Sequence, residues 1–228
     1  MSLAAAFLLF FAVKNALYPP EGEEIELWYL IFKTLPTIVT LFVQLLMMSA
    51  NRYAFLLGGC NSVIYGIVYF MEDVPFSGIS ALMLSFLPQI YSFINWGKNS
   101  RSGKASLRRL PAKYIAVAVA VFGGLWAFSY FWLSKYMTIR IPLLDTLTFS
   151  LGIISTALAA VRYIESQYVS FISCVGALIM WILLTVQDPS NINFAVIAVY
   201  NLYCVALTAI NWTMIYVKDK KAAEIVEK

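Results

Sequence analysis

Long apolar stretches alternate with short polar ones along the whole of the 228-residue chain. The apolar stretches cover roughly residues 3–18, 25–48, 53–70, 76–97, 113–134, 141–161, 166–186 and 192–217. A helix needs ~20 residues to cross a bilayer, and most of these stretches approach that length. The first is shorter and contains Lys14, so it forms either a membrane span or a tilted, peripheral helix. The pattern predicts an all-α integral membrane protein.

Short sequence markers recur in the same order in the two halves of the chain. Ile94-Asn95-Trp96 returns as Ile210-Asn211-Trp212 after 116 residues, and Asn51-Arg52-Tyr53 has a counterpart in Val161-Arg162-Tyr163 after 110 residues. Ordered repetition of this kind predicts a duplication. The unpaired stretch 113–134 restores the original orientation of the second copy, which makes the repeat a parallel one.

The duplication divides the chain into five parts. We expect an extra N-terminal helix (1–20), a first three-helix repeat (25–97), a basic loop with a connector helix (98–140), a second three-helix repeat (141–218) and a cytoplasmic tail (219–228). The core is therefore predicted to hold seven helices, arranged as three, one and three. In transporters built from such repeats, the substrate site lies near mid-membrane between the repeats.

Composition favours a chain that faces lipid, and the charges orient it. Hydrophobic residues make up 61% and charged residues 12% of the chain, whereas about a quarter of a soluble domain is charged. If the 98–113 linker is cytoplasmic, twelve of the Lys and Arg residues between the stretches lie inside, and two, Lys135 and Arg140, lie outside. Because short basic loops stay in the cytoplasm, we expect both termini to be cytoplasmic.

Polar side chains follow one face of the stretches 76–97 and 192–217. Those of interest as substrate ligands are Gln89, Ser92, Asn193, Asn201 and Thr208. Helical spacing places the members of each stretch on one side of their helix. Amides turned towards lipid would have no partner, so we expect both faces to point inward. The side chains then either hold helices together or bind the substrate.

Aromatic side chains at membrane depth could bind a flat ring. Trp181 and Tyr65 occupy matching positions in the expected repeat, and Tyr200 and Tyr203 flank Asn201. A cationic ring would gain further from an aromatic face. Trp181 can also be explained as ordinary packing, and both explanations stay open from the sequence.

The cytoplasmic ends of the same helices carry a second set of candidates. Trp96 and Trp212, with Asn95 and Asn211 beside them, serve there either as interface anchors or as a gate. Pro88 interrupts the backbone hydrogen bonds in mid-helix, which gives either a hinge or a static kink.

The sequence lacks the groups that catalysis in a membrane would need. The chain has no His, and its Asp and Glu lie near the ends of the stretches. We therefore expect no enzyme activity, no catalytic residue, no metal site and no cofactor. A proton relay would need an acid at membrane depth, so passive movement of a substrate is favoured. A retinal protein is excluded because 192–217 has no Lys.

The arrangement resembles the PnuC family of bacterial vitamin transporters. The shared features are the three, one and three helices, the Leu87-Pro88-Gln89 string, the Asn-Trp helix ends and the basic middle loop, over about residues 25–218. In architecture the family is similar to the SWEET and PQ-loop sugar transporters. The resemblance implies facilitated diffusion of nicotinamide riboside, an NAD precursor, with a cytoplasmic ribosylnicotinamide kinase trapping it by phosphorylation.

The same resemblance implies the surroundings of the protein. The protein would lie in the bacterial inner membrane, in contact with its lipid, and would form a homo-oligomer such as a trimer. It would bind no nucleic acid. Trp and Asn side chains would also suit thiamine, so thiamine, riboflavin and a sugar of the SWEET kind remain alternative substrates.

Overall fold

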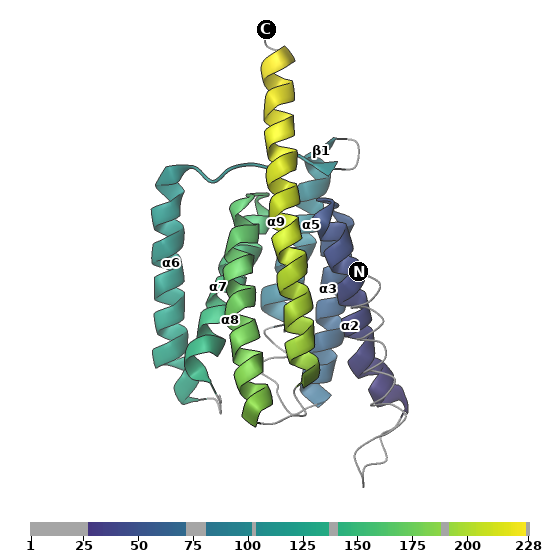
Figure 1. The fold of residues 1–228 in the computed structure, drawn as a ribbon, viewed down its shortest axis with the longest axis vertical. Coiled ribbons are helices and arrows are strands. Elements are labelled where there is room, and N and C mark those ends of the chain that lie inside the picture. The colour runs from purple at the N-terminus through teal and green to yellow at the C-terminus, as the bar shows by residue number, and fades with distance from the viewer. Residues whose placement is uncertain (1–26, 72–80, 102–103, 137–140, 188–191, 227–228) are drawn as a thin grey trace.

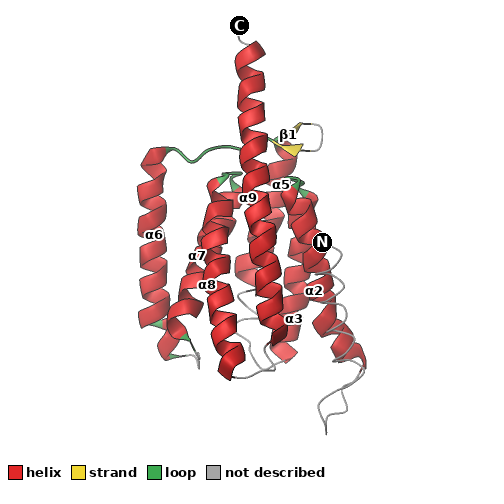
Figure 2. Cartoon of the chain, in the orientation of Figure 1, coloured by secondary structure: helices red, strands yellow, loops and turns green. Residues whose placement is uncertain are grey.

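A computed structural model describes residues 27–71, 81–101, 104–136, 141–187 and 192–226. Helices dominate this part of the chain (Figure 2). The helices are α2 (Leu27–Met48), α3 (Tyr53–Met71), the π-helical η1 (Ala81–Phe86), α5 (Leu87–Lys98), α6 (Ala112–Phe131), the 3-10 turn η2 (Leu133–Lys135), α7 (Pro142–Ala160), α8 (Glu165–Gln187) and α9 (Ile192–Val226). Two short strands, β1 (Ser100–Arg101) and β2 (Lys104–Ala105), form an antiparallel hairpin. The predicted all-α class is confirmed, and the expected helix 3–18 lies outside the described residues.

Six of the helices form a ring made of two three-helix units. In the first unit α2 packs on α3, and α3 packs on η1 and α5. In the second unit α7 packs on α8, and α8 packs on α9. The ring closes through two contacts between the units, α2 with α9 and α5 with α7. Helix α6 lies outside the ring against α7 (Figure 1). The predicted arrangement of three, one and three helices is therefore confirmed.

The linker between α5 and α6 and the C-terminal end of α9 lie at the same end of the bundle, which we call the linker end (Figure 1). The turns that join α2 to α3 and α7 to α8 lie there too. These are the segments that carry Arg52, Arg162 and the basic linker. The basic segments that the sequence assigns to one side of the membrane are therefore together at one end.

The α2–α3 and α7–α8 turns have the same backbone structure. In the first, Ala50 N donates to Met47 O (3.0 Å) and Asn51 N to Leu46 O (3.1 Å). In the second, Arg162 N donates to Ala159 O (2.9 Å) and Tyr163 N to Leu158 O (3.0 Å). Ala50 and Arg162 both have left-handed backbones, with φ of 52° and 69°. Each turn is therefore a helix end of the Schellman type.

This equivalence corrects the register that the sequence markers suggested. Arg162 corresponds to Ala50, a spacing of 112, and not to Arg52 at a spacing of 110. The Trp96 and Trp212 markers keep their spacing of 116. The difference of four residues arises between Asn61 and Ser92 in the first unit and between Ser173 and Thr208 in the second. Basic residues follow the membrane surface, so they can shift by two positions without changing the turn.

The stretch expected as one helix over 76–97 is described from Ala81 and changes its winding. The wider π-helical turn of η1 comes immediately before α5, in which Pro88 is the second residue. Proline has no N–H for the carbonyl four residues before it, so a wider turn can adjust the backbone there. At the other end of the chain, α9 continues to Val226, beyond the expected end at 217. Its added residues include Lys, Ala and Glu, which are strong helix formers in water.

Four described helices are long and apolar enough to cross a membrane by length and composition: Ala112–Phe131, Pro142–Ala160, Glu165–Gln187 and Ala198–Lys221. The outer surface of the ring and of α6 is rich in exposed apolar side chains, such as Val119 and Phe131 on α6. Apolar area on this scale belongs in lipid. The protein is a multi-pass membrane protein.

Candidate gate and binding region

Trp96 of the first unit and Trp212 of the second meet inside the ring near the linker end. Both side chains are fully buried, at 0% exposure, and their ring centroids are 5.1 Å apart at an interplanar angle of 50°. Trp96 Nε1 donates to Ala159 O at 2.8 Å, and Trp212 Nε1 donates to Met47 O at 2.8 Å. Each indole thus gives a second hydrogen bond to a carbonyl in the last turn of a helix of the opposite unit, because Arg162 N and Ala50 N also donate to Ala159 O and Met47 O.

A compact apolar cluster surrounds the two indoles. Its other buried members are Ala50, Phe55, Leu107, Ala159 and Ile164, with Met47, Phe93, Ile215 and Tyr216 packed against them. Phe55 meets Trp96 edge to face at 4.7 Å. Asn95 adds a polar contact between the units, because its Nδ2 donates to Ala160 O at 2.7 Å. Asn211 is half-buried next to Trp212. We call this layer the Trp cluster.

One helical turn before each Trp, a fully buried hydroxyl occupies the matching position. Ser92 Oγ donates to Pro88 O (2.7 Å) and Thr208 Oγ1 donates to Cys204 O (2.8 Å). Both side chains have 0% exposure. Their hydroxyls are satisfied by their own helices, and both side chains lie one helical turn from the Trp cluster.

Gln89 contacts the neighbouring helix of its own unit. Its Nε2 donates to Ser62 Oγ on α3 at 3.0 Å, and Ser62 Oγ donates to Gly58 O at 3.0 Å. The amide also lies against Gly58, where an added Cβ would overlap Gln89 Oε1. In this arrangement Gln89 joins α5 to α3.

Asn201, the second candidate amide, differs from Gln89 in its hydrogen bonding. Its Oδ1 is buried and has no hydrogen-bond partner among the described residues. A buried oxygen without a partner costs about 1–3 kcal/mol, so it is a strong site for a ligand donor. The two candidate amides are thus not joined to each other, since Gln89 bonds to Ser62.

The aromatic candidates separate into inward and outward groups. Tyr200 is buried, whereas Tyr203 is 54% exposed on the outside of α9, so Tyr203 does not belong to an internal aromatic cage. Trp181 is half-buried on α8, and its carbonyl accepts a hydrogen bond from Thr185 Oγ1 at 2.7 Å. The side chains of Tyr65 and Asn193 lie outside the part that the structure describes.

Asn61 on α3 is a buried polar residue that the sequence did not single out. Its Nδ2 donates to Pro36 O (3.1 Å) and to Thr40 Oγ1 (3.0 Å), which joins α3 to α2. In the second unit Ser173 Oγ donates to Thr148 O at 3.1 Å, at positions 112 residues later. The signal that could have found this pair is the spacing of 112, which the marker at 110 obscured.

The same pair of contacts fixes the register of α3 against α8. A spacing of 112 makes position 69 the counterpart of Trp181, so the expected match with Tyr65 is one helical turn out of register. The repeat therefore supports Trp181 as a substrate ligand less directly than the sequence suggested.

The basic linker is attached to the α7–α8 turn. Arg108 N donates to Arg162 O (2.9 Å), and Ile164 N donates to Arg108 O (3.0 Å), as in a parallel bridge. Arg162 Nη1 donates to Ser106 O at 2.9 Å. Burial, with a smaller effect of the Arg108 charge, lowers the pKa of Arg162. The guanidinium stays charged, because its ordinary pKa is far above neutral.

Together these features describe a ring of helices that is closed at the linker end. The Trp cluster fills the ring at the linker end, while amide and aromatic side chains lie deeper on the helices that face each other. Asp145 and Glu165, the acidic residues of α7 and α8, lie in the first turns of these helices.

Comparisons with known proteins agree with this picture. A sequence profile described as Nicotinamide mononucleotide transporter matches residues 30–214. A solved structure, described as the crystal structure of the Vitamin B3 transporter PnuC, superposes with a TM-score of 0.69 over 96% of this chain and 93% of that one. Its sequence is 16% identical, so the likeness concerns the fold. No curated protein sequence matches the chain significantly.

Proposed function

Because the chain belongs to the family of nicotinamide mononucleotide transporters, we propose that it carries nicotinamide riboside across a bacterial inner membrane by facilitated diffusion. The family assignment makes it a membrane transporter. The proposal adds the substrate, the absence of a driving ion and the orientation, with both termini and the linker end facing the cytoplasm.

The observation that carries the choice of substrate is the lack of Lys and Arg in the interiors of five of the ring helices, α3, α5, α7, α8 and α9. Helices α3, α5, α7 and α8 carry no Lys or Arg between their end turns, and α9 has none before Lys218. The side chain of Lys33, on α2, lies outside the described part. Phosphate groups are recognised by Arg, Lys or clusters of backbone N–H groups. A mononucleotide would therefore be poorly served, whereas a riboside needs neutral hydrogen-bonding groups and an aromatic surface.

The side chains of the ring supply these groups. Asn201 offers a buried, unpartnered oxygen to a hydroxyl of the ribose. Helix α9 also carries Thr208, and α5 carries Gln89 and Ser92. These three side chains complete the polar positions. Trp181 and Tyr200 provide aromatic faces for the cationic nicotinamide ring, an interaction worth about 0.5–2 kcal/mol.

Facilitated diffusion is favoured because the described helices hold no acid away from their end turns until Asp219 of α9. An acid at membrane depth is the usual means of coupling to a proton or cation gradient. Net uptake then requires removal of the riboside inside the cell, for which phosphorylation by a cytoplasmic kinase is sufficient. The basic linker and α9 end, placed in the cytoplasm, follow the usual charge asymmetry of membrane proteins.

The test is transport by purified protein in sealed liposomes. Labelled nicotinamide riboside should equilibrate without an ion gradient, and neither a pH step nor a sodium gradient should make it accumulate. Nicotinamide mononucleotide, thiamine, riboflavin and a simple sugar are the competing substrates. Faster equilibration of the mononucleotide than of the riboside would overturn the proposed substrate, and accumulation driven by a gradient would overturn the mechanism.

A further inference from the structure

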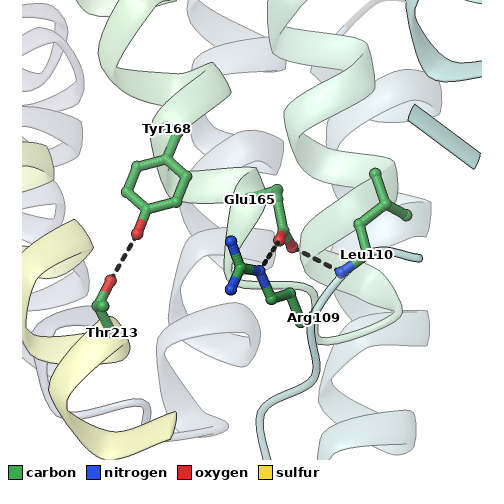
Figure 3. Close-up of polar contacts among 5 residues, drawn as sticks. All are labelled: Arg109, Leu110, Glu165, Tyr168 and Thr213. Atoms are coloured by element: carbon green, nitrogen blue, oxygen red, sulfur yellow. Dashed lines mark hydrogen bonds and ion pairs between the residues drawn. The ribbon is translucent and has the colours of Figure 1, made fainter. Parts of the chain in front are cut away.

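Residues 106–110 of the linker, which we call the strap, lie across the linker end of the ring. Hydrogen bonds in both directions join Arg108 to the α7–α8 turn, and Arg162 Nη1 donates to Ser106 O (2.9 Å). At its far end, Leu110 N donates to Glu165 Oε2 at 2.9 Å, and Arg109 Nε lies 3.7 Å from Glu165 Oε1 (Figure 3). The strap is therefore fixed to the second unit along its whole length.

Leu107 is the residue of the strap that points into the protein. It is 6% exposed, although Ser106, Arg108 and Arg109 on either side are exposed. Its side chain belongs to the Trp cluster, together with Trp96 and Trp212. A buried Leu among basic residues of a surface loop needs a packing reason, and here it completes the apolar layer that closes the ring.

The strap also has an attachment to the first unit. Ser106 N donates to Asn99 O at 3.1 Å, directly after the β1–β2 hairpin. Asn99 caps the end of α5, where its N–H bonds to Gly97 O and Trp96 O and its Nδ2 bonds to Asn95 O (2.8 Å). The chain from Asn99 to Leu110 thus connects the end of α5 with the α7–α8 turn, across the contact between the two units.

We propose that the strap is part of the gate at the linker end, with Leu107 as a gate residue and the Asn99–Ser106 contact as the tie that holds the two units together there. The inference rests on the proposed transport function. Opening at this end separates α5 from the α7–α8 turn, so the tie must lengthen. The hairpin between Asn99 and Ser106 supplies the extra chain once their hydrogen bond breaks.

A reversible cross-link tests the tie. In a variant without the native cysteines, Asn99→Cys and Ser106→Cys are introduced together. The register of the hairpin, Ser100 with Ala105, makes these two residues the next antiparallel pair. Opposite residues in such a pair have Cα atoms about 4.5–5.5 Å apart, which a disulfide can span.

We expect oxidation to reduce riboside exchange at least about tenfold, a change of about 1.4 kcal/mol in the barrier, and reduction to restore it. The matched control is Ser155→Cys with Ser170→Cys, whose hydroxyls contact each other between α7 and α8 within the second unit. Cross-linking that pair should leave exchange unchanged. Equal exchange by the oxidised and reduced Asn99–Ser106 variants would overturn the tie.

A second experiment tests Leu107 without any substrate. Ser92→Cys, buried one turn before Trp96, reports on access past the Trp cluster from the linker side. Leu107→Ala should speed its modification by a charged, membrane-impermeant thiol reagent by about tenfold, equivalent to ~1.4 kcal/mol in the opening equilibrium. Leu143→Ala, at a 51% exposed position of α7, is the control.

The two readouts separate the gate from the transport function. If wild-type protein exchanges no riboside but Leu107→Ala opens the path to position 92, the proposed substrate fails and the gate stands. If the protein transports riboside while Leu107→Ala leaves the modification rate unchanged, the gate residue is wrong and the function stands.

Discussion

Trp96 and Trp212 make equivalent contacts between the two units: each indole donates a hydrogen bond, at 2.8 Å, to the last turn of a helix in the other unit. The two rings touch at the centre of the ring of helices, 5.1 Å apart. Closure at the linker end therefore depends on two equivalent polar contacts and the aromatic pair between them.

Removing either indole N–H should weaken this closure. Trp96→Phe and Trp212→Phe each remove one hydrogen bond between the units, although Ala159 O and Met47 O keep the turn bonds from Arg162 N and Ala50 N. We expect each variant to lower the free energy of unfolding by at least about 1 kcal/mol, the net value of one hydrogen bond, with a further loss from the volume that the smaller ring leaves unfilled. The two effects should not add, because the rings share one contact. Chemical denaturation in detergent measures both singles and the double variant. Trp132→Phe, at the 58% exposed residue that follows α6, should change little. Strict additivity would mean that the pair does not act as a unit.

Asn201 and Gln89 should respond differently to truncation. Asn201 Oδ1 has no partner among the described residues, so Asn201→Ala should leave stability unchanged or improve it, while riboside binding weakens by about 1–3 kcal/mol. Gln89→Ala removes the bond to Ser62, so it should cost about 0.5–1.5 kcal/mol of stability as well.

Calorimetric titration with riboside, together with thermal unfolding of the same samples, separates the two effects for Asn201 and Gln89. Ser62→Ala is the matched control for Gln89, because it removes the same bond and keeps the amide. Wild-type affinity in Asn201→Ala would exclude this residue from the substrate site.

Asn61 and Ser173 should stabilise their units in equivalent ways. Asn61→Ala removes two hydrogen bonds between α3 and α2, and Ser173→Ala removes one between α8 and α7. At about 1 kcal/mol for each bond, the first variant should be the more destabilised, and the double variant should show the sum because the two sites share no partner. The measurement is the denaturant midpoint of each variant, compared between variants whose free energy of unfolding has the same dependence on denaturant concentration. A larger loss for Ser173→Ala would contradict the equivalence.

The two ends of α6 should face opposite sides of the membrane. In a variant without the native cysteines, Ser106→Cys, next to the linker end, and Tyr136→Cys, 76% exposed beyond the other end of α6, are introduced one at a time. In whole cells an impermeant reagent should label position 136 and reach position 106 only after permeabilisation, because the basic segments stay inside. Labelling of both positions from outside would contradict the proposed orientation.

The sequence was sufficient for the fold because hydropathy and repetition are long-range signals. Eight apolar stretches and the Asn-Trp markers led to the unit structure, in which only the helix 3–18 lies outside the described residues. The register of the first two helices of each unit was harder to predict. Long apolar helices give few fixed points, and the basic markers Arg52 and Arg162 report the membrane surface and not the backbone alignment.

The candidate site was predictable only in part, because it depends on how each helix is rotated. Trp96 and Trp212 were identified, but the hydrogen bonds that they make across the ring could not be predicted from the sequence. The bond from Gln89 to Ser62 depends on the rotation of α3 against α5, about which the sequence says little. Leu107 had no signal at all, since one Leu in a basic loop looks like part of a linker.

The exchanged Trp contacts have the form of an isologous interface within a single chain. Residue i of one half meets residue j of the other, and j meets i, as in a dimer with a two-fold axis. A dimer of identical halves would have to carry the same side chain at both related positions. Joining the halves in one polypeptide removes that constraint. Asn61 can therefore bond to Pro36 O while Ser173 bonds to the equivalent carbonyl, Thr148 O. This freedom suits an asymmetric solute such as the proposed riboside, whose two ends differ in chemistry.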